Sequence, residues 1–168
     1  MPRGYQLSQE AHITPVIYPK DATGGTTGDC INMAKYGHVS FILKIGAAAA
    51  ALTGILVESC TAANGAGASA IPFTIYPGET SRGTAGSDVL AAKVSASAGG
   101  YTPPNVANIF YVIELPSMAL PVGVNAATFL RVRLTAPASS IMVQCDAILS
   151  GGRYVGDQNS DATASALI

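Results

Sequence analysis

Short apolar runs, separated by clusters of glycine, proline, asparagine and threonine, are the feature that most constrains how this chain can fold. The runs are rich in β-branched and aromatic residues, and the clearest are Val39–Ile45, Asn108–Leu115, Thr128–Leu134 and Ile141–Leu149. Runs of this length, bounded by turn residues, are typical of strands, whereas helical signals are weak throughout. The sequence therefore predicts an all-β fold: a single-domain antiparallel β-sandwich, jelly-roll-like, with an extended N-terminal arm.

Alternation within the runs predicts which side chains face the core. In Thr128–Leu134, Phe129, Arg131 and Arg133 share one face and the aliphatic residues share the other. We expect this run to form an antiparallel hairpin with Ile141–Leu149, and Gly54–Cys60 to be the partner of Val39–Ile45.

The N-terminal region differs from the rest because it mixes polar residues with a few aliphatic ones and carries Pro15. Because of Pro15, we interpret the run 13–18 as an edge strand or an extended arm. We expect residues 1–29 to be an arm and loop, residues 30–157 the β-sandwich, and residues 158–168 a flexible tail. Residues 2–18 are predicted to add a strand to a neighbouring molecule, which makes Ile13, Val16 and Ile17 candidate interface residues. No apolar leader segment is visible in the first residues, and the apolar stretch 45–57 is too short to span a bilayer. No membrane partner is expected.

Charge is scarce: 9 Lys and Arg oppose 10 Asp and Glu, and 11% of the residues are charged. The basic residues are scattered, which argues against binding to nucleic acid, because that binding depends on clustered Lys and Arg. A surface so poor in charge is unusual for a free monomer and indicates assembly into a larger structure. The alternative is a monomer with a bland surface of small polar residues.

No spacing of residues points to catalysis or to a metal. The two histidines, His12 and His38, lie near no other ligand at zinc-site spacing, so we expect no metal, no cofactor and no enzymatic activity. Asp21 and Asp29 lack the calcium-loop pattern and are better explained by turns. Two weaker enzyme hypotheses stay open: a cysteine nucleophile (Cys30, Cys60 or Cys145) with His38, and a glycosidase pair drawn from Glu58, Glu79 and Glu114. Free cysteines are more often small buried apolar residues.

Arg131 and Arg133 are the most informative charges, since they project from one face of a strand. Either they are solvated or edge-guarding side chains, or they form an interface stripe that pairs with acidic groups of a partner.

Three stretches carry a resemblance to a known family: KYGHVSFILKIGAAA at 35–49, IFYVIEL at 109–115 and AILSGGRYVGD at 147–157. With them, the region of about residues 30–157 resembles small auxiliary head proteins of tailed bacteriophages, the cement or decoration proteins. The resemblance implies a β-sandwich, often a homotrimer, made in the host cytoplasm and bound to the major capsid protein on the capsid surface of the virion.

The sequence thus favours a structural virion protein that binds the outside of an icosahedral shell and stabilises it. One alternative is another virion component, such as a tail-tube or head-completion protein. A second is a carbohydrate-binding β-sandwich that uses Tyr101, Tyr111 and Tyr154 as stacking residues.

Overall fold

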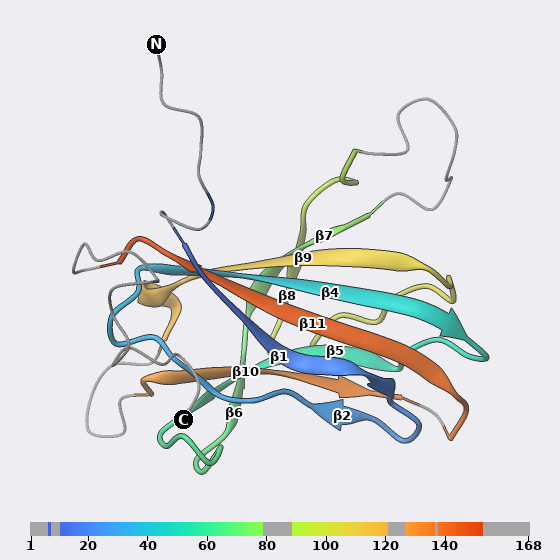
Figure 1. Cartoon of the computed structure of the whole chain (residues 1–168), viewed down its shortest axis with the longest axis horizontal. Helices are drawn as coiled ribbons and strands as arrows, with labels where there is room; N and C mark the ends of the chain where they lie inside the picture. The colour runs from blue at the N-terminus through green and yellow to red at the C-terminus, as the bar shows by residue number, and fades with distance from the viewer. Residues whose placement is uncertain (1–6, 8–10, 79–88, 121–126, 137, 153–168) are drawn as a thin grey trace.

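Two antiparallel β-sheets pack face to face in the computed structural model (Figure 1). The structure describes residues 7, 11–78, 89–120, 127–136 and 138–152. One sheet has six strands, in the spatial order β1 (His12–Asp21), β11 (Ile141–Ser150), β4 (His38–Ala48), β9 (Ile109–Pro116), β7 (Phe73–Pro77) and β8 (Val94–Ala96). The other has five: β2 (Thr26–Thr27), β10 (Phe129–Thr135), β5 (Gly54–Cys60) and β6 (Ser69–Ile71) in order, with β3 (Ile31–Asn32) also paired to β10. The predicted all-β sandwich is confirmed.

The strand pairing is that of a jelly roll. The first long strand pairs with the last, β1 with β11, and inside this pair β2 and β3 lie against β10, β4 against β9, and β5 against β6. Such nested pairing is what results when one long antiparallel ribbon is rolled into two sheets. Most neighbours in a sheet are therefore distant in the sequence.

Two expected pairings are wrong for this reason. β4 and β5 lie in different sheets, as do β10 and β11, so neither pair forms a hairpin. The connections between them cross the sandwich instead of turning within a sheet. A short connection is compatible with both arrangements, so connection length could not identify the partner.

The chain also changes sheet at Pro72. β6 ends at Ile71 in the five-stranded sheet, and β7 begins at Phe73 in the six-stranded sheet. Proline has no backbone N–H to donate to a sheet, which ends the first strand and allows the turn into the second. In Figure 1 this segment rises from the lower layer to the upper one.

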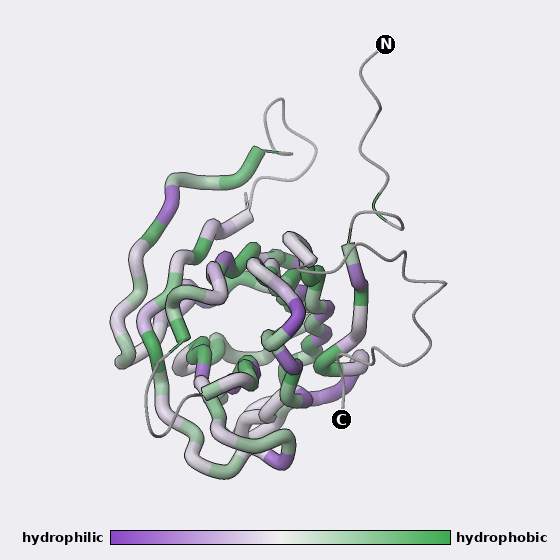
Figure 2. The backbone as a smooth tube through the Cα atoms, turned by 90° about the vertical axis from the view of Figure 1, so that its left-hand side faces the viewer, coloured by the Kyte–Doolittle hydropathy of each residue, from purple (hydrophilic) through white to green (hydrophobic). Residues whose placement is uncertain are grey.

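The core lies between the sheets and is built from alternate strand positions. Phe41, Leu43, Tyr111, Leu130 and Val132 are completely buried there. Figure 2, turned by 90° from Figure 1, shows the backbone curling around this core. The predicted inward face of β10 is confirmed.

In the N-terminal region, the run 13–18 forms an edge strand, which was one of its two interpretations, and the expected arm is corrected in part. Residues 12–21, expected in the arm, form β1 at the edge of the chain's own six-stranded sheet, with Ile13 opposite Ile148 and Ile17 opposite Cys145. Val16 and Ile17 are 2% and 3% exposed because they pack into the core. The sandwich therefore includes β1 and β2, which precede the predicted boundary. Residues 1–6 and 8–10 of the expected arm, and the expected tail at 158–168, lie outside the described residues.

Candidate functional site

Glu58, Arg131 and Arg133, which we call the arginine cluster, lie on the outer face of the five-stranded sheet. β5 and β10 are antiparallel neighbours, and the register places Arg131 directly opposite Glu58. Arg133 is two residues further along β10 and so points to the same side. Two strands that are distant in the sequence thus bring one carboxylate between two guanidinium groups.

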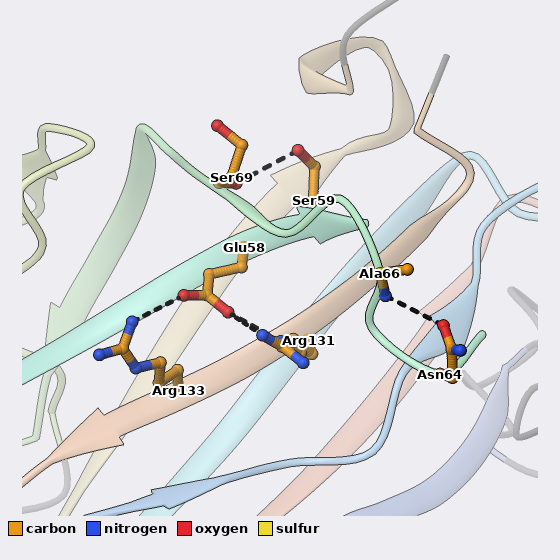
Figure 3. Close-up of polar contacts among 7 residues, drawn as sticks. All are labelled: Glu58, Ser59, Asn64, Ala66, Ser69, Arg131 and Arg133. Carbon is orange, nitrogen blue, oxygen red and sulfur yellow. Dashed lines mark hydrogen bonds and ion pairs between the residues drawn. The ribbon is translucent and has the colours of Figure 1, made fainter. Parts of the chain in front are cut away.

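Both oxygens of the Glu58 carboxylate are used (Figure 3). Arg131 donates to Oε2 from Nε and Nη2, each at 2.7 Å, and Arg133 donates to Oε1 from Nη1 at 3.0 Å. Hydrogen bonds between charged groups at these distances are among the stronger polar interactions in proteins. The carboxylate therefore fixes the position of both arginine side chains.

A loop at residues 61–68 explains why an outward-facing cluster is partly buried. Gly65 has φ +80, and a Cβ there would collide with Nη1 of Arg131. Asn64 holds the loop closed by accepting a hydrogen bond from the backbone N–H of Ala66 at 3.0 Å (Figure 3). The side chains of Glu58 and Arg131 are consequently 6% and 20% exposed, whereas that of Arg133 is 46% exposed.

The electrostatics of the cluster favour the charged forms. Burial alone would raise the pKa of Glu58, but the hydrogen bonds and positive charges of Arg131 and Arg133 outweigh it and hold the pKa below its usual value. Burial would likewise lower the pKa of Arg131, and the hydrogen bond to Glu58 reverses this and raises it. Two guanidinium groups and one carboxylate leave one net positive charge. The half-exposed Arg133 can present that charge to an acidic group from another molecule.

A second surface lies on the other side of the molecule, on the outer face of the six-stranded sheet. An open groove of about 620 Å³ is lined there mainly by apolar side chains, with Pro19, Ile42, Gly46, Phe110 and Met142 among its lining residues. Phe110 and Met142 are 38% and 40% exposed. This groove can accept apolar side chains but offers few polar groups for recognition.

The predicted interface residues are thus divided among three places. Arg131 and Arg133 come together with Glu58, and because β10 lies between β2 and β5 they do not guard a sheet edge. Ile13 is 37% exposed on the outer face of the six-stranded sheet, whereas Val16 and Ile17 are buried in the core and are not available to a partner.

Sequence analysis missed the role of Glu58 and the apolar outer face. The sequence suggests Glu58 only as a member of a glycosidase pair, because its arginine partners become visible only with the strand register. A signal for the outer face was present in the run 109–115, which is apolar at both alternate sets of positions, including Phe110 and Val112.

The structure places most residues of the two enzyme hypotheses in different sheets, and Cys30 directly precedes β3 of the five-stranded sheet. His38 points to the outer face of the six-stranded sheet, where Nε2 lies 2.7 Å from Oε2 of Glu114. Cys145 faces the core from β11, and Cys60 belongs to the other sheet. Glu58 and Glu114 also lie in different sheets, and Glu79 is outside the described residues.

The three cysteines are free and buried. Burial is the main reason why the pKa of Cys60 is raised to about 11, and it also raises the pKa of Cys145. The thiols of Cys60 and Cys145 are therefore held in the protonated, less nucleophilic form. They match the interpretation as small buried apolar residues.

Asp21 forms a turn, as expected. Its Oδ1 accepts hydrogen bonds from the backbone N–H and the hydroxyl of Thr23 at 2.9 and 2.8 Å. Its carboxylate also accepts hydrogen bonds from the Ser140 hydroxyl at 2.7 Å and from the backbone N–H of Ile141 at 3.2 Å. Asp21 thereby ties the end of β1 to the start of β11.

Of the tyrosines expected to stack on sugars, Tyr111 is completely buried and Tyr101 packs against it, with ring centroids 6.0 Å apart. Tyr111 is therefore not available to a sugar. Tyr154 lies outside the described residues.

Within the described ranges, no three His, Cys, Asp or Glu side chains gather closely enough to hold a metal ion. Nor does that part of the chain contain a helix with the length and apolar character needed to cross a bilayer. No protein-family model matches the chain, and no curated protein matches its sequence.

Proposed function

We propose that this protein is a structural virion protein that binds the outside of a tailed-phage icosahedral capsid and stabilises the assembled shell. The observation that carries the proposal is the arginine cluster, a positively charged surface that is already ordered by Glu58. The resemblance of residues 30–157 to cement and decoration proteins supports it. The jelly roll is compatible with it, since viral capsid proteins use that architecture, but lectins do too, so fold alone does not decide.

The arginine cluster is suited to binding a surface that is repeated many times on an assembled shell. Arg133 is held by Glu58 on one side and is 46% exposed, so little side-chain freedom is lost when it meets a carboxylate of the major capsid protein. Each contact is modest, but an assembled shell presents many copies of the same surface, so the contacts accumulate. A protein that binds only the assembled shell stabilises it by its free energy of binding, and no catalytic step is needed.

Co-sedimentation with expanded empty phage heads tests the proposal. We expect the wild-type protein to pellet with heads, and Arg133→Ala to bind about tenfold more weakly or worse. Lys20→Ala is the matched control, because it removes an exposed positive charge from β1, away from the cluster, and should bind like wild type. Wild-type protein that stays in the supernatant at saturating head concentration would refute the proposal.

A role of the N-terminal arm in binding cannot be tested by deleting residues 2–18. This deletion would remove most of β1, with Val16 and Ile17 of the core, so loss of binding would follow from unfolding. Deletion of residues 2–10 spares β1. We expect it to abolish head binding and leave thermal unfolding unchanged, and undiminished binding would contradict a role for the arm.

The alternatives give different results in the same samples. A tail-tube or head-completion protein would form rings on sizing and would not coat heads. A carbohydrate-binding module would bind glycans in an array, and Tyr111 would play no part because it is buried.

A further inference from the structure

The outer face of the six-stranded sheet departs from the pattern of a solvated sheet. An antiparallel sheet with one face in water normally carries polar residues at its outward positions. Here the outward positions of β4, β9, β11 and β1 include Ile42, Phe110, Val112, Met142, Ile148 and Ile13. The register brings several of them together, since Ile42 is opposite Val112 and Ile13 is opposite Ile148.

The groove lies at one end of this face, between Phe110 on β9 and Met142 on β11. Its floor is low because Gly46 has no side chain, and a Cβ there would stand 3.4 Å from the Cβ of Met142. The groove is thus a shaped apolar surface in the middle of strand residues and not a gap between loops. It fits side chains that project from another sheet.

The charged groups on this face are already paired with one another. Nζ of Lys44 lies 3.1 Å from Oδ2 of Asp146, and Gln144 donates to the same carboxylate. At the other end of the face, Glu114 accepts a hydrogen bond from Ser40 at 2.9 Å and contacts His38. A partner can therefore cover the face without burying an isolated charge, which is the costly event in such contacts.

We propose that a second copy of this chain packs against the outer face of the six-stranded sheet. A face that packs on its own copy does so about a two-fold axis, so each contact is made twice. Two-fold packing matches this face because Lys44 and Asp146 lie side by side and carry opposite charges. Lys44 of each copy can approach Asp146 of the other copy. The surface is self-complementary in charge as well as apolar.

The size of the face comes close to what a dimer interface needs. Strands lie about 4.8 Å apart and rise about 3.3 Å per residue, so four strands of eight to eleven residues cover roughly 600 Å² in projection. Side chains increase the accessible area beyond this flat value. A standard stable interface buries about 800 Å² on each partner, so this one sheet face supplies most of what is required.

This inference goes beyond the proposed function and does not depend on it. The arginine cluster lies on the opposite sheet, so in the dimer it faces outward on both copies. The dimer also differs from the homotrimer that the family resemblance implies. Light scattering distinguishes the two, because the chain mass is 17.0 kDa and the dimer has twice that mass.

The first test places a charge on the face. We expect wild-type protein to have the mass of a dimer, and Met142→Lys to weaken the dimer at least about a hundredfold, since its partner would have to bury an unpaired charge. Met118→Lys is the matched control. Met118 is 92% exposed in the 3₁₀ turn Ser117–Ala119, which follows the end of β9 that is opposite to the groove, so this variant should stay dimeric. Circular dichroism and thermal unfolding verify that both variants are folded.

The second test reverses the charges. Lys44→Asp leaves two acids on each copy and Asp146→Lys leaves two bases, so each variant alone should be monomeric. Mixing the two should restore a dimer that contains one copy of each variant. An ion pair that acts only within one chain predicts no recovery on mixing, and that result would overturn the inference.

A wild-type protein that is monomeric or trimeric across a dilution series would also overturn the inference. If that monomeric protein pellets with phage heads and its Met142→Lys variant does not, the face belongs to the contact with the shell. If Met142→Lys is monomeric and still pellets with heads, both the dimer contact and the proposed function stand.

Discussion

Glu58 shows how one residue can organise a surface. Its side chain is 6% exposed, and both carboxylate oxygens accept hydrogen bonds from arginines. These bonds offset the cost of burying the negative charge. Replacing Glu58 lowers stability mainly through Arg131. Its guanidinium group would remain under the 61–68 loop without a counter-charge.

We therefore expect Glu58→Gln to lower the free energy of unfolding by about 2 kcal/mol. Glu114→Gln is the control, since it makes the same chemical change at a side chain that is 30% exposed and should cost less than about 1 kcal/mol. Urea unfolding measures both. Equal effects would mean that the arginine cluster adds nothing beyond a surface ion pair.

Tyr111 contrasts with Glu58, because its buried polar group is not paired within the described part of the chain. Its hydroxyl is buried and has no hydrogen-bond partner among the described residues. Burial, and to a smaller degree the neighbouring Tyr101, raise the pKa of Tyr111 to about 12, so the hydroxyl stays protonated. We expect Tyr111→Phe to increase the free energy of unfolding by about 1 kcal/mol, measured by thermal unfolding, because it removes an unsatisfied donor and keeps the ring. A loss of stability would show that the hydroxyl has a partner.

At the scale of elements, the 61–68 loop is coupled to the arginine cluster through Gly65. Gly65→Ala imposes two costs, a side chain at φ +80 and a collision with Arg131. Gly24→Ala has nearly the same φ, +76, but its Cβ would meet nothing within 4 Å. We expect Gly24→Ala to lower the free energy of unfolding, measured in urea, by about 1 kcal/mol, and Gly65→Ala to lower it clearly more. In a background that also carries Arg131→Ala, the two glycine substitutions should have equal effects.

Asp21 joins two elements and gives the fold an acid-sensitive link. Hydrogen bonds from Ser140, Thr23 and Ile141 lower its pKa from 3.8 to about 2. A lowered pKa in the folded state means that the stabilisation is complete above pH 3.8 and is lost as the pH falls toward 2. We expect Asp21→Asn to reduce the slope of Tm against pH in that window. An unchanged slope would contradict the link between β1 and β11.

The elements themselves could largely be predicted from the sequence, because alternation in Val39–Ile45 and Thr128–Leu134 reports directly on which side of a strand is buried. Their partners could not. The pairing of β4 with β9 and of β5 with β10 is decided by contacts across the whole chain, which no local pattern encodes. Glu58 was hidden for the same reason, since its meaning depends on which residues lie on the neighbouring strand.

At the scale of the whole molecule, the jelly-roll order prevents either sheet from standing alone. Among the described strands, the chain passes from one sheet to the other six times: between β1 and β2, β3 and β4, β4 and β5, β6 and β7, β9 and β10, and β10 and β11. Loss of one sheet would expose the inner face of the other and cut most of its connections. The two sheets should therefore unfold as one cooperative unit.

Buried cysteines allow this to be measured sheet by sheet. Cys145 lies in the six-stranded sheet and Cys60 in the five-stranded sheet, and both are 0% exposed. In single-cysteine variants, we expect both thiols to become reactive toward a labelling reagent at the same urea concentration. Separate midpoints would show that the sheets unfold independently.

The pairing of the first long strand with the last has a mechanical consequence. His12 lies opposite Leu149, and Ser150 ends β11 at the same end of the sheet where β1 begins. A pulling force applied at His12 and Ser150 would load the hydrogen bonds of this pair one after another, as in a zipper, and not all together in shear. A fold that resists denaturant as a single unit should thus open at low force when it is pulled by these two strand ends.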